Sequence, residues 1–250
     1  MTAGFIHGIH AVRTHLFREH QSSSCLILKS GNRGPRLREI EKQARKLGCQ
    51  IDYFDKAQLD KVTPNHQGVI LQVASRALKE KSLDTLIDEP GNNKLFLILD
   101  GVTDPRNLGA CIRSAATLGV TAVLAPKSNS APLSAVASKT ASGGTNIVPY
   151  VQVTNLSRAI NLLKEAGFWI VGTVLESSTA LARLDLTGNI VLVLGSEDKG
   201  LRRITKDSCD FLATIPMVEN SLGFNVSVAA GICLYEIQRQ RELATGDAIL

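Results

Sequence analysis

Three segments far apart in the sequence place polar side chains next to glycine, directly after an apolar stretch. The first carries Asn107 and Arg113, the second Glu197, and the third Asn225 and Ser227. An arginine can bind a phosphate through two parallel hydrogen bonds, and polar groups at a helix start can hold a ligand or a nucleic-acid backbone. A carboxylate between glycines suits a cationic or hydroxyl-bearing ligand. Three loops with this same pattern indicate one functional site rather than three unrelated turns.

The elements that must position these loops follow from the apolar pattern after Leu95. Continuous apolar runs predict strands, and apolar residues at helical spacing predict the helices between them. Such strands are typical of a mostly parallel sheet that helices cover on both faces, so we predict an α/β fold. The predicted strands are 95–99, 121–125, 168–174, 190–194 and 211–215, and the helices are 108–118, 133–142, 155–166 and 226–241.

Each loop also has an ordinary structural interpretation. Arg113 follows Asn107 by six residues, so both lie on roughly one side of a helix, but Arg113 could simply pair with Asp100 or Asp104. The second loop could cap a helix through Ser196 or Asp198. Local spacing leaves both alternatives open.

Several enzyme classes are disfavoured. The second loop superficially resembles a P-loop, but Leu201 and Arg202 follow Gly200 where a P-loop needs Lys and then Ser or Thr. No GxGxxG follows a strand, which disfavours a Rossmann dinucleotide site, and no GxSxG is present. His66 lies in a turn that leads into a strand, and we interpret it as structural.

The excess positive charge is confined to the N-terminal part of the chain. Residues 1–75 contain 11 Lys and Arg against 6 Asp and Glu, whereas residues 76–250 contain 17 of each. A patch of this kind can bind phosphates with a salt-dependent affinity, or it can be a solvated helix face. Seven of the cations lie close together: Lys29, Arg33, Arg36, Arg38, Lys42, Arg45 and Lys46.

The pattern predicts two domains. Residues 1–75 form a small αβ module, 76–94 are a polar linker with a Pro-Gly turn, 95–243 form the second domain and 244–250 a frayed tail. The module contains helices over 8–17 and 37–47 and strands over 25–28, 50–54 and 68–74.

Composition predicts a cytoplasmic protein without metal. The five cysteines are scattered without CxxC spacing, which favours free thiols in a reducing cytosol, and the histidines show no metal-ligand pattern. No apolar run reaches the roughly 18–20 residues that span a bilayer, and no signal peptide is evident at the N-terminus.

Taken together, the three loops resemble the three sequence motifs of the SpoU-type (TrmH) RNA ribose 2′-O-methyltransferases of the SPOUT superfamily. Their order and spacing agree, and two N-terminal segments look like the substrate-binding domain of this family. The resemblance spans nearly the whole chain and is closest to the bacterial 23S rRNA guanosine-2′-O-methyltransferase branch. It is carried by residues 8–12, 66–69, 107–113, 194–200, 215–217 and 225–229.

The resemblance implies an L30e-like RNA substrate-binding domain over 1–75 and a catalytic domain with a deep trefoil knot over 95–243. It implies S-adenosylmethionine as cofactor, held in a bent shape by the loops of the knot, and 23S rRNA as substrate. It also implies a homodimer whose active site lies close to the interface.

The resemblance further implies catalytic roles. Arg113 would clamp a substrate phosphate, since a guanidinium stays protonated and is a poor general base. The other motif side chains would orient the ribose or the cofactor, and no metal is needed. These are Asn107, Glu197, Asn225 and Ser227.

Five further residues are implied to line the cofactor pocket: Thr173, Gly195, Ile215, Met217 and Phe224. The family usually has Ser-Leu-Asn where this chain has Gly223, Phe224 and Asn225. Phe224 therefore replaces a leucine of the adenine pocket, and we expect a tighter pocket with activity retained.

Two other functions stay open at this point. The same reaction could act on tRNA, although the N-terminal module favours rRNA. The chain could instead be a non-catalytic RNA-binding factor in ribosome assembly. The combination of Arg113, Glu197, Asn225 and Ser227 argues against a pure binder, which has no need of all four.

Overall fold

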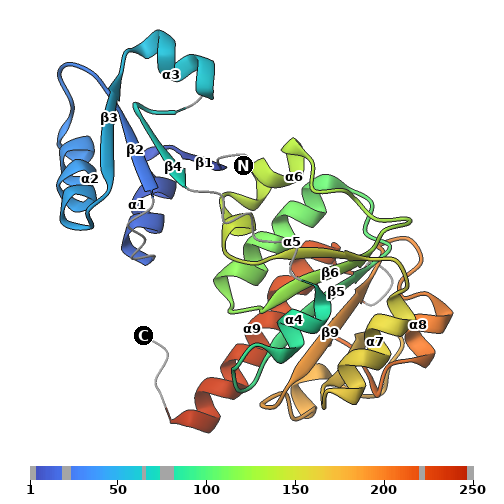
Figure 1. The fold of residues 1–250 in the computed structure, drawn as a ribbon. Coiled ribbons are helices and arrows are strands. Elements are labelled where there is room, and N and C mark those ends of the chain that lie inside the picture. The colour runs from blue at the N-terminus through green and yellow to red at the C-terminus, as the bar shows by residue number, and fades with distance from the viewer. Residues whose placement is uncertain (1–3, 19–23, 64–65, 74–81, 220–222, 247–250) are drawn as a thin grey trace. The chain divides into compact units, whose positions relative to one another are not determined.

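The computed structural model describes residues 4–18, 24–63, 66–73, 82–219 and 223–246 (Figure 1). The chain divides into two compact units, Met1–Lys79 and Glu80–Leu250. Among the described residues, no helix is both long and apolar enough to cross a membrane.

The first unit is built on a four-stranded sheet in the order β1–β4–β2–β3, in which only the β2–β3 pair is parallel. Side chains alternate across β2, so Leu26 and Leu28 pack against α1 and α2, and Ile27 packs against Leu59 of α3. The elements are β1 (Gly4–His7), α1 (Ile9–Arg18), β2 (Ser24–Lys29), α2 (Pro35–Lys46), β3 (Gln50–Phe54), α3 (Lys56–Val62) and β4 (Val69–Val73).

Two elements of this unit were absent from the sequence prediction, β1 and α3. The capping box of α3 is a signal that finds it, because Asp55 accepts a hydrogen bond from the Gln58 N–H and the Gln58 side chain accepts one from the Asp55 N–H. His66 is buried, and its Nδ1 accepts a hydrogen bond of 2.9 Å from Gly68 N, so the structural interpretation of this residue is confirmed.

The second unit is built on a six-stranded sheet in the order β10–β8–β9–β5–β6–β7, with every pairing parallel. The predicted α/β class with a mostly parallel sheet is confirmed. The strands are β5 (Leu95–Asp100), β6 (Ala122–Pro126), β7 (Tyr150–Val153), β8 (Trp169–Thr173), β9 (Ile190–Gly195) and β10 (Phe211–Ala213).

Helices cover both faces of this sheet, as Figure 1 shows. Leu95, Leu97 and Leu99 of β5 face the core shared with α5, α6 and α9, and Phe96 and Ile98 face the core shared with α4 and α7. The helices are α4 (Leu83–Asp88), α5 (Pro105–Thr117), α6 (Ala135–Ala141), α7 (Leu156–Glu165), α8 (Arg203–Asp207) and α9 (Val226–Thr245), with 3-10 turns at Gly144–Asn146 and Leu181–Arg183.

Some boundaries differ from the sequence prediction. Helix α4 lies inside the stretch assigned to a linker, and its Leu83 and Leu86 are buried in the second unit, whereas residues 74–81 lie outside the described part of the chain. Strand β7 was not predicted, because its side chains are only half-buried and carry no continuous apolar run. Helix α9 continues to Thr245, two residues into the predicted tail. The trefoil knot stays a prediction.

An ion pair between a buried carboxylate and a partly exposed arginine holds the end of β5 against the segment that precedes α8. Asp100 is 1% exposed, and its two oxygens accept hydrogen bonds from Arg202 Nε (2.6 Å) and Arg202 N (3.1 Å). A buried carboxylate needs such partners, because an unpaired one keeps its full desolvation cost. The pair therefore anchors the loop between β9 and α8.

Replacing Arg202 with alanine should destabilise the second unit by about 2–3 kcal/mol, since it leaves Asp100 buried with one of its two partners removed. Urea unfolding, followed through Trp169, the single tryptophan of the chain, measures this. The control is Arg203→Ala, because the Arg203 side chain is 96% exposed. Equal destabilisation by the two variants would contradict the role of the Asp100 pair.

Candidate active site

A pocket of about 850 Å³ lies in the second unit, beyond the carboxyl ends of β8, β9 and β10. Ligands of parallel α/β sheets bind at this edge, because the loops that follow neighbouring strands converge there. Three stretches supply most of its lining: 173–176 at the end of β8, 194–201 at the end of β9, and a set from 214 to 229 that leads into α9. Lys206 of α8 adds to it.

The loop after β9 closes tightly on itself. The backbones of Ser196 and Gly200 exchange hydrogen bonds of 3.2 and 2.8 Å, and Ser196 Oγ accepts a third from Lys199 N. A Cβ at Gly195 would overlap the backbone of Gly200 and Leu201, so only glycine fits there. The alternative of a helix cap at Ser196 or Asp198 is wrong, because the next helix, α8, begins at Arg203 with Arg202 as its N-cap.

Two helix caps set the positions of the amide side chains. Asp104 caps α5 by accepting a hydrogen bond of 2.8 Å from Arg106 N, and with Pro105 in the first position this places Asn107 in the first turn. Asn225 caps α9, where its Oδ1 accepts from Ser227 N (2.9 Å) and Ser227 Oγ (2.6 Å). The cap of α5 does not use the Asn107 side chain, and the cap of α9 uses only Oδ1 of Asn225. The amide N–H groups of both asparagines can therefore donate hydrogen bonds elsewhere.

Those amide groups meet at one carboxylate oxygen. Glu197 Oε1 accepts hydrogen bonds from Asn107 Nδ2 (3.0 Å), Val226 N (3.2 Å) and Asn225 Nδ2. Asn225 Nδ2 also donates to Asn107 Oδ1 over 3.2 Å. The structure thus brings Asn107, Glu197, Asn225 and Ser227 together, although the two asparagines that meet are 118 residues apart in the sequence.

Arg113 lies apart from this network. It is exposed on α5, about 9 Å along the helix and about 120° around it from Asn107, and it does not line the pocket. The expectation that Asn107 and Arg113 lie on one side of the helix is therefore wrong. Within the described parts of the chain its guanidinium has no ion pair or hydrogen bond. The alternative that it pairs with Asp100 or Asp104 is wrong, because Asp100 binds Arg202 and Asp104 caps α5.

All five residues expected at the cofactor line the pocket: Thr173, Gly195, Ile215, Met217 and Phe224. Glu197 and Asn225 line it as well. Sequence reasoning missed Leu175, Glu176 and Lys206, which also contribute to the wall. For Leu175 and Glu176, their place directly after β8 is the signal that finds them.

The cysteine thiols of this unit are poor nucleophiles. Burial raises the pKa of Cys111, Cys209 and Cys233 to about 12 each, so these thiols stay protonated at neutral pH. Cys111 lies on α5, and the nearby Glu197 carboxylate adds to the rise of its pKa. Over the described residues, no group of three His, Cys, Asp or Glu side chains is placed to hold a metal ion.

Curated relatives match nearly the whole chain. A 23S rRNA (guanosine-2′-O-)-methyltransferase, RlmB, of Coxiella burnetii is 44% identical over 239 residues, which cover 95% of this chain and 96% of the relative. RlmB of Vibrio vulnificus is 43% identical over 244 residues, which cover 96% of this chain and 98% of the relative.

Solved structures share the fold. The SpoU methyltransferase AviRb of Streptomyces viridochromogenes has a TM-score of 0.71 at 22% identity, with 98% of this chain and 91% of that chain covered. An AdoMet-bound rRNA methyltransferase of Sinorhizobium meliloti has a TM-score of 0.66 at 23% identity, with 95% and 87% covered.

Family models match both units. Residues 5–78 match the RNA 2′-O ribose methyltransferase substrate-binding domain, and residues 94–235 match the SpoU rRNA methylase family. The second match covers more than half of the chain, and it includes the Asn107–Glu197–Asn225 network and the pocket beside it. The chain belongs to the SpoU rRNA methylase family.

Proposed function

We propose that this protein transfers the methyl group of S-adenosylmethionine to the ribose 2′-hydroxyl of a guanosine in 23S rRNA. The observation that carries the proposal is the Glu197 network at the wall of the pocket, which gathers hydrogen-bonding groups from three loops at one place. Relatives that match at least 94% of this chain at 40–44% identity bear the name of that activity.

The pocket suits the cofactor. Its volume falls in the roughly 300–1,000 Å³ range of small-molecule sites. Leu194, Ile215, Met217 and Phe224 give it an apolar wall for an adenine ring, and Glu197 adds a carboxylate that favours a cation. When bound, S-adenosylmethionine supplies an electrophilic methyl group on a positively charged sulfur.

Glu197 positions the groups around the reacting hydroxyl. Its Oε1 is held by three protein donors, whereas its Oε2 has no hydrogen-bond partner within the described residues. We infer that Oε2 accepts a hydrogen bond from a ribose hydroxyl and that Asn107, Asn225 and Ser227 keep the carboxylate in place for it. Groups held in advance of the reaction avoid reorganisation in the transition state.

Arg113 serves the RNA rather than the cofactor. In the transfer a C–S bond breaks, a C–O bond forms and the hydroxyl proton must leave, but a guanidinium cannot take that proton. The Arg113 charge is exposed and has no ion pair within the described residues, so it is suited to a phosphate next to the modified ribose. A phosphate held there can itself relay the proton.

We also propose a homodimer with the site close to its interface. Val228 and Tyr235 of α9 are exposed, and a second copy packed on this helix would cover them. Because Arg113 lies outside the pocket of its own chain, a neighbouring subunit could bring substrate and arginine together. We propose that the protein acts in the cytoplasm, because its proposed substrate is 23S rRNA.

The other functions are less well supported. Solved tRNA-modifying relatives cover 68% and 61% of this chain, so they account for less of it than the RlmB relatives do. A non-catalytic RNA binder would have no need of the Glu197 network beside a pocket of this size.

Glu197→Gln should lower kcat for methyl transfer to a 23S rRNA fragment by about 100-fold, because the uncharged amide no longer orients the hydroxyl. Binding of S-adenosylmethionine, measured by calorimetry, should change less than tenfold. Glu165→Gln, an exposed substitution on α7, serves as the matched control. An unchanged kcat in Glu197→Gln would refute the positioning role.

Arg113→Ala should reduce kcat/KM for the RNA about 10–100-fold, because it removes one charge-assisted hydrogen bond to a phosphate. Such a bond contributes roughly 1.5–3 kcal/mol. The Kd for S-adenosylmethionine should stay within twofold of wild type, because Arg113 does not line the pocket. Arg158→Ala, an exposed arginine of α7, is the control. Weaker cofactor binding with unimpaired RNA turnover would exclude the phosphate clamp.

A further inference from the structure

Helix α2 carries a row of cations with no acid among them. Arg38, Lys42 and Lys46 follow each other at four-residue intervals, so they share one face of the helix. All three are exposed, and within the described residues none forms an ion pair; the Nε of Arg38 donates to the Arg33 carbonyl oxygen (2.9 Å). Like charges four residues apart destabilise a helix by about 0.2–0.5 kcal/mol per pair. The row is therefore a cost to folding.

The two acids of α2 do not offset this row, because both are engaged elsewhere. Glu39 pairs with Arg13 of α1 over 3.4 Å. Glu41 faces β3, where Tyr53 Oη donates a hydrogen bond of 2.7 Å to its Oε1.

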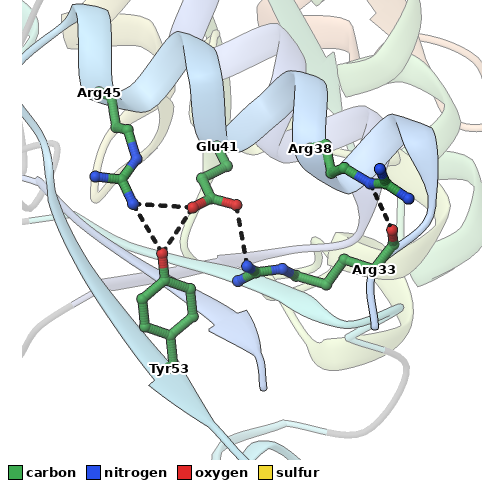
Figure 2. Close-up of polar contacts among 5 residues, drawn as sticks. All are labelled: Arg33, Arg38, Glu41, Arg45 and Tyr53. Carbon is green, nitrogen blue, oxygen red and sulfur yellow. Dashed lines mark hydrogen bonds and ion pairs between the residues drawn. The ribbon is translucent and has the colours of Figure 1, made fainter. Parts of the chain in front are cut away.

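Figure 2 shows the contacts that Glu41 makes with Arg33, Arg45 and Tyr53. Its Oε1 also accepts from Arg45 Nη2 (3.0 Å), and its Oε2 pairs with Arg33 Nη2 (3.4 Å), while the Arg33 guanidinium lies 4.7 Å from the centroid of the Tyr53 ring. The hydrogen bond from Tyr53, followed by the two arginines, holds the pKa of Glu41 below its usual value, so it stays ionised. One carboxylate thus fixes two arginines and leaves a net positive charge.

The opposite face of the same sheet is balanced. Helix α3 covers it with Lys56 and Lys61, accompanied by Asp55 and Asp60. Among the described residues of the first unit, the charge excess is therefore carried on the α2 side. An uncompensated row of cations beside a fixed arginine fits a partner with repeated negative charges.

We propose that the α2 surface, defined as Arg38, Lys42, Arg45 and Lys46 with Tyr53 at its edge, binds the phosphate backbone of the rRNA substrate. The inference rests on the proposed function and names the face and the residues that contact RNA. Arg45 is suited to a two-point phosphate contact, because Glu41 and Tyr53 hold its guanidinium from one side and its side chain remains largely exposed. The lysines act as point charges.

The test compares two lysine pairs on opposite faces of the unit. Binding of a 23S rRNA fragment is measured against salt concentration for Lys42→Ala/Lys46→Ala and for the matched control Lys56→Ala/Lys61→Ala. The α2 variant should bind at least tenfold more weakly, and its slope of log K against log salt should be shallower by about 1.4–1.8, the value for two lost phosphate contacts. The α3 variant should match wild type.

An α3 variant that weakens binding as much as the α2 variant, or an unchanged salt slope in the α2 variant, would overturn the inference. Lys42→Gln/Lys46→Gln removes the charge but keeps a polar side chain, and it must give the same result; circular dichroism verifies that each variant is folded. Weaker binding of a poly-aspartate competitor without any change in RNA binding would assign the surface to an acidic protein instead.

Methyl transfer separates this inference from the proposed function. The α2 variant should show a raised KM for RNA with kcat near wild type, since the substitutions lie far from the pocket in sequence and in a different unit. A wild-type chain that binds rRNA through α2 but transfers no methyl group would refute the proposed function alone. Full transfer with an unchanged KM in the α2 variant would refute the α2 surface alone.

Discussion

One carboxylate oxygen joins the three loops of the site. Glu197 Oε1 receives donors from the start of α5 and from the start of α9, which lie 90 and 28 residues away in the sequence. Hydrogen bonds to an ionised acceptor are stronger than neutral ones, so this point adds a polar link between segments that the sheet and the packing of α5 on α9 already bring close. The shape of the pocket wall, the orientation of both asparagines and the free Oε2 all depend on it.

That meeting point depends in turn on the parallel sheet. Strands β5 and β9 are neighbours in register, with Asp100 opposite Gly195, so the loops that follow them leave the same edge side by side. The Asp100–Arg202 pair then fixes the far end of the second loop, and the missing side chain of Gly195 lets this loop close on itself. The strand register thus determines where the loops lie, and the positions of the loops determine how the hydrogen-bonding groups are arranged.

The sequence was a good guide to local features. It predicted the α/β class and the polar first turn of α9, and the five residues that the family resemblance assigned to the cofactor all line the pocket. It could not predict which groups meet, because Asp100 and Arg202 are 102 residues apart and no local pattern encodes their contact. It also missed β7, whose half-buried side chains lack the apolar run of an interior strand.

The distribution of charge over the two units has a physical reason. A cationic methyl donor would be repelled by a strongly positive site, and the pocket instead contains three acids, Glu176, Glu197 and Asp198, against two lysines. RNA needs the opposite sign, and the α2 surface supplies it on a separate unit. RNA binding requires positive charges that act through solvent, whereas the transfer site requires fixed hydrogen-bonding groups and must not repel a cation. Two separate units meet both, because the charges that attract the RNA are not the charges that surround the donor.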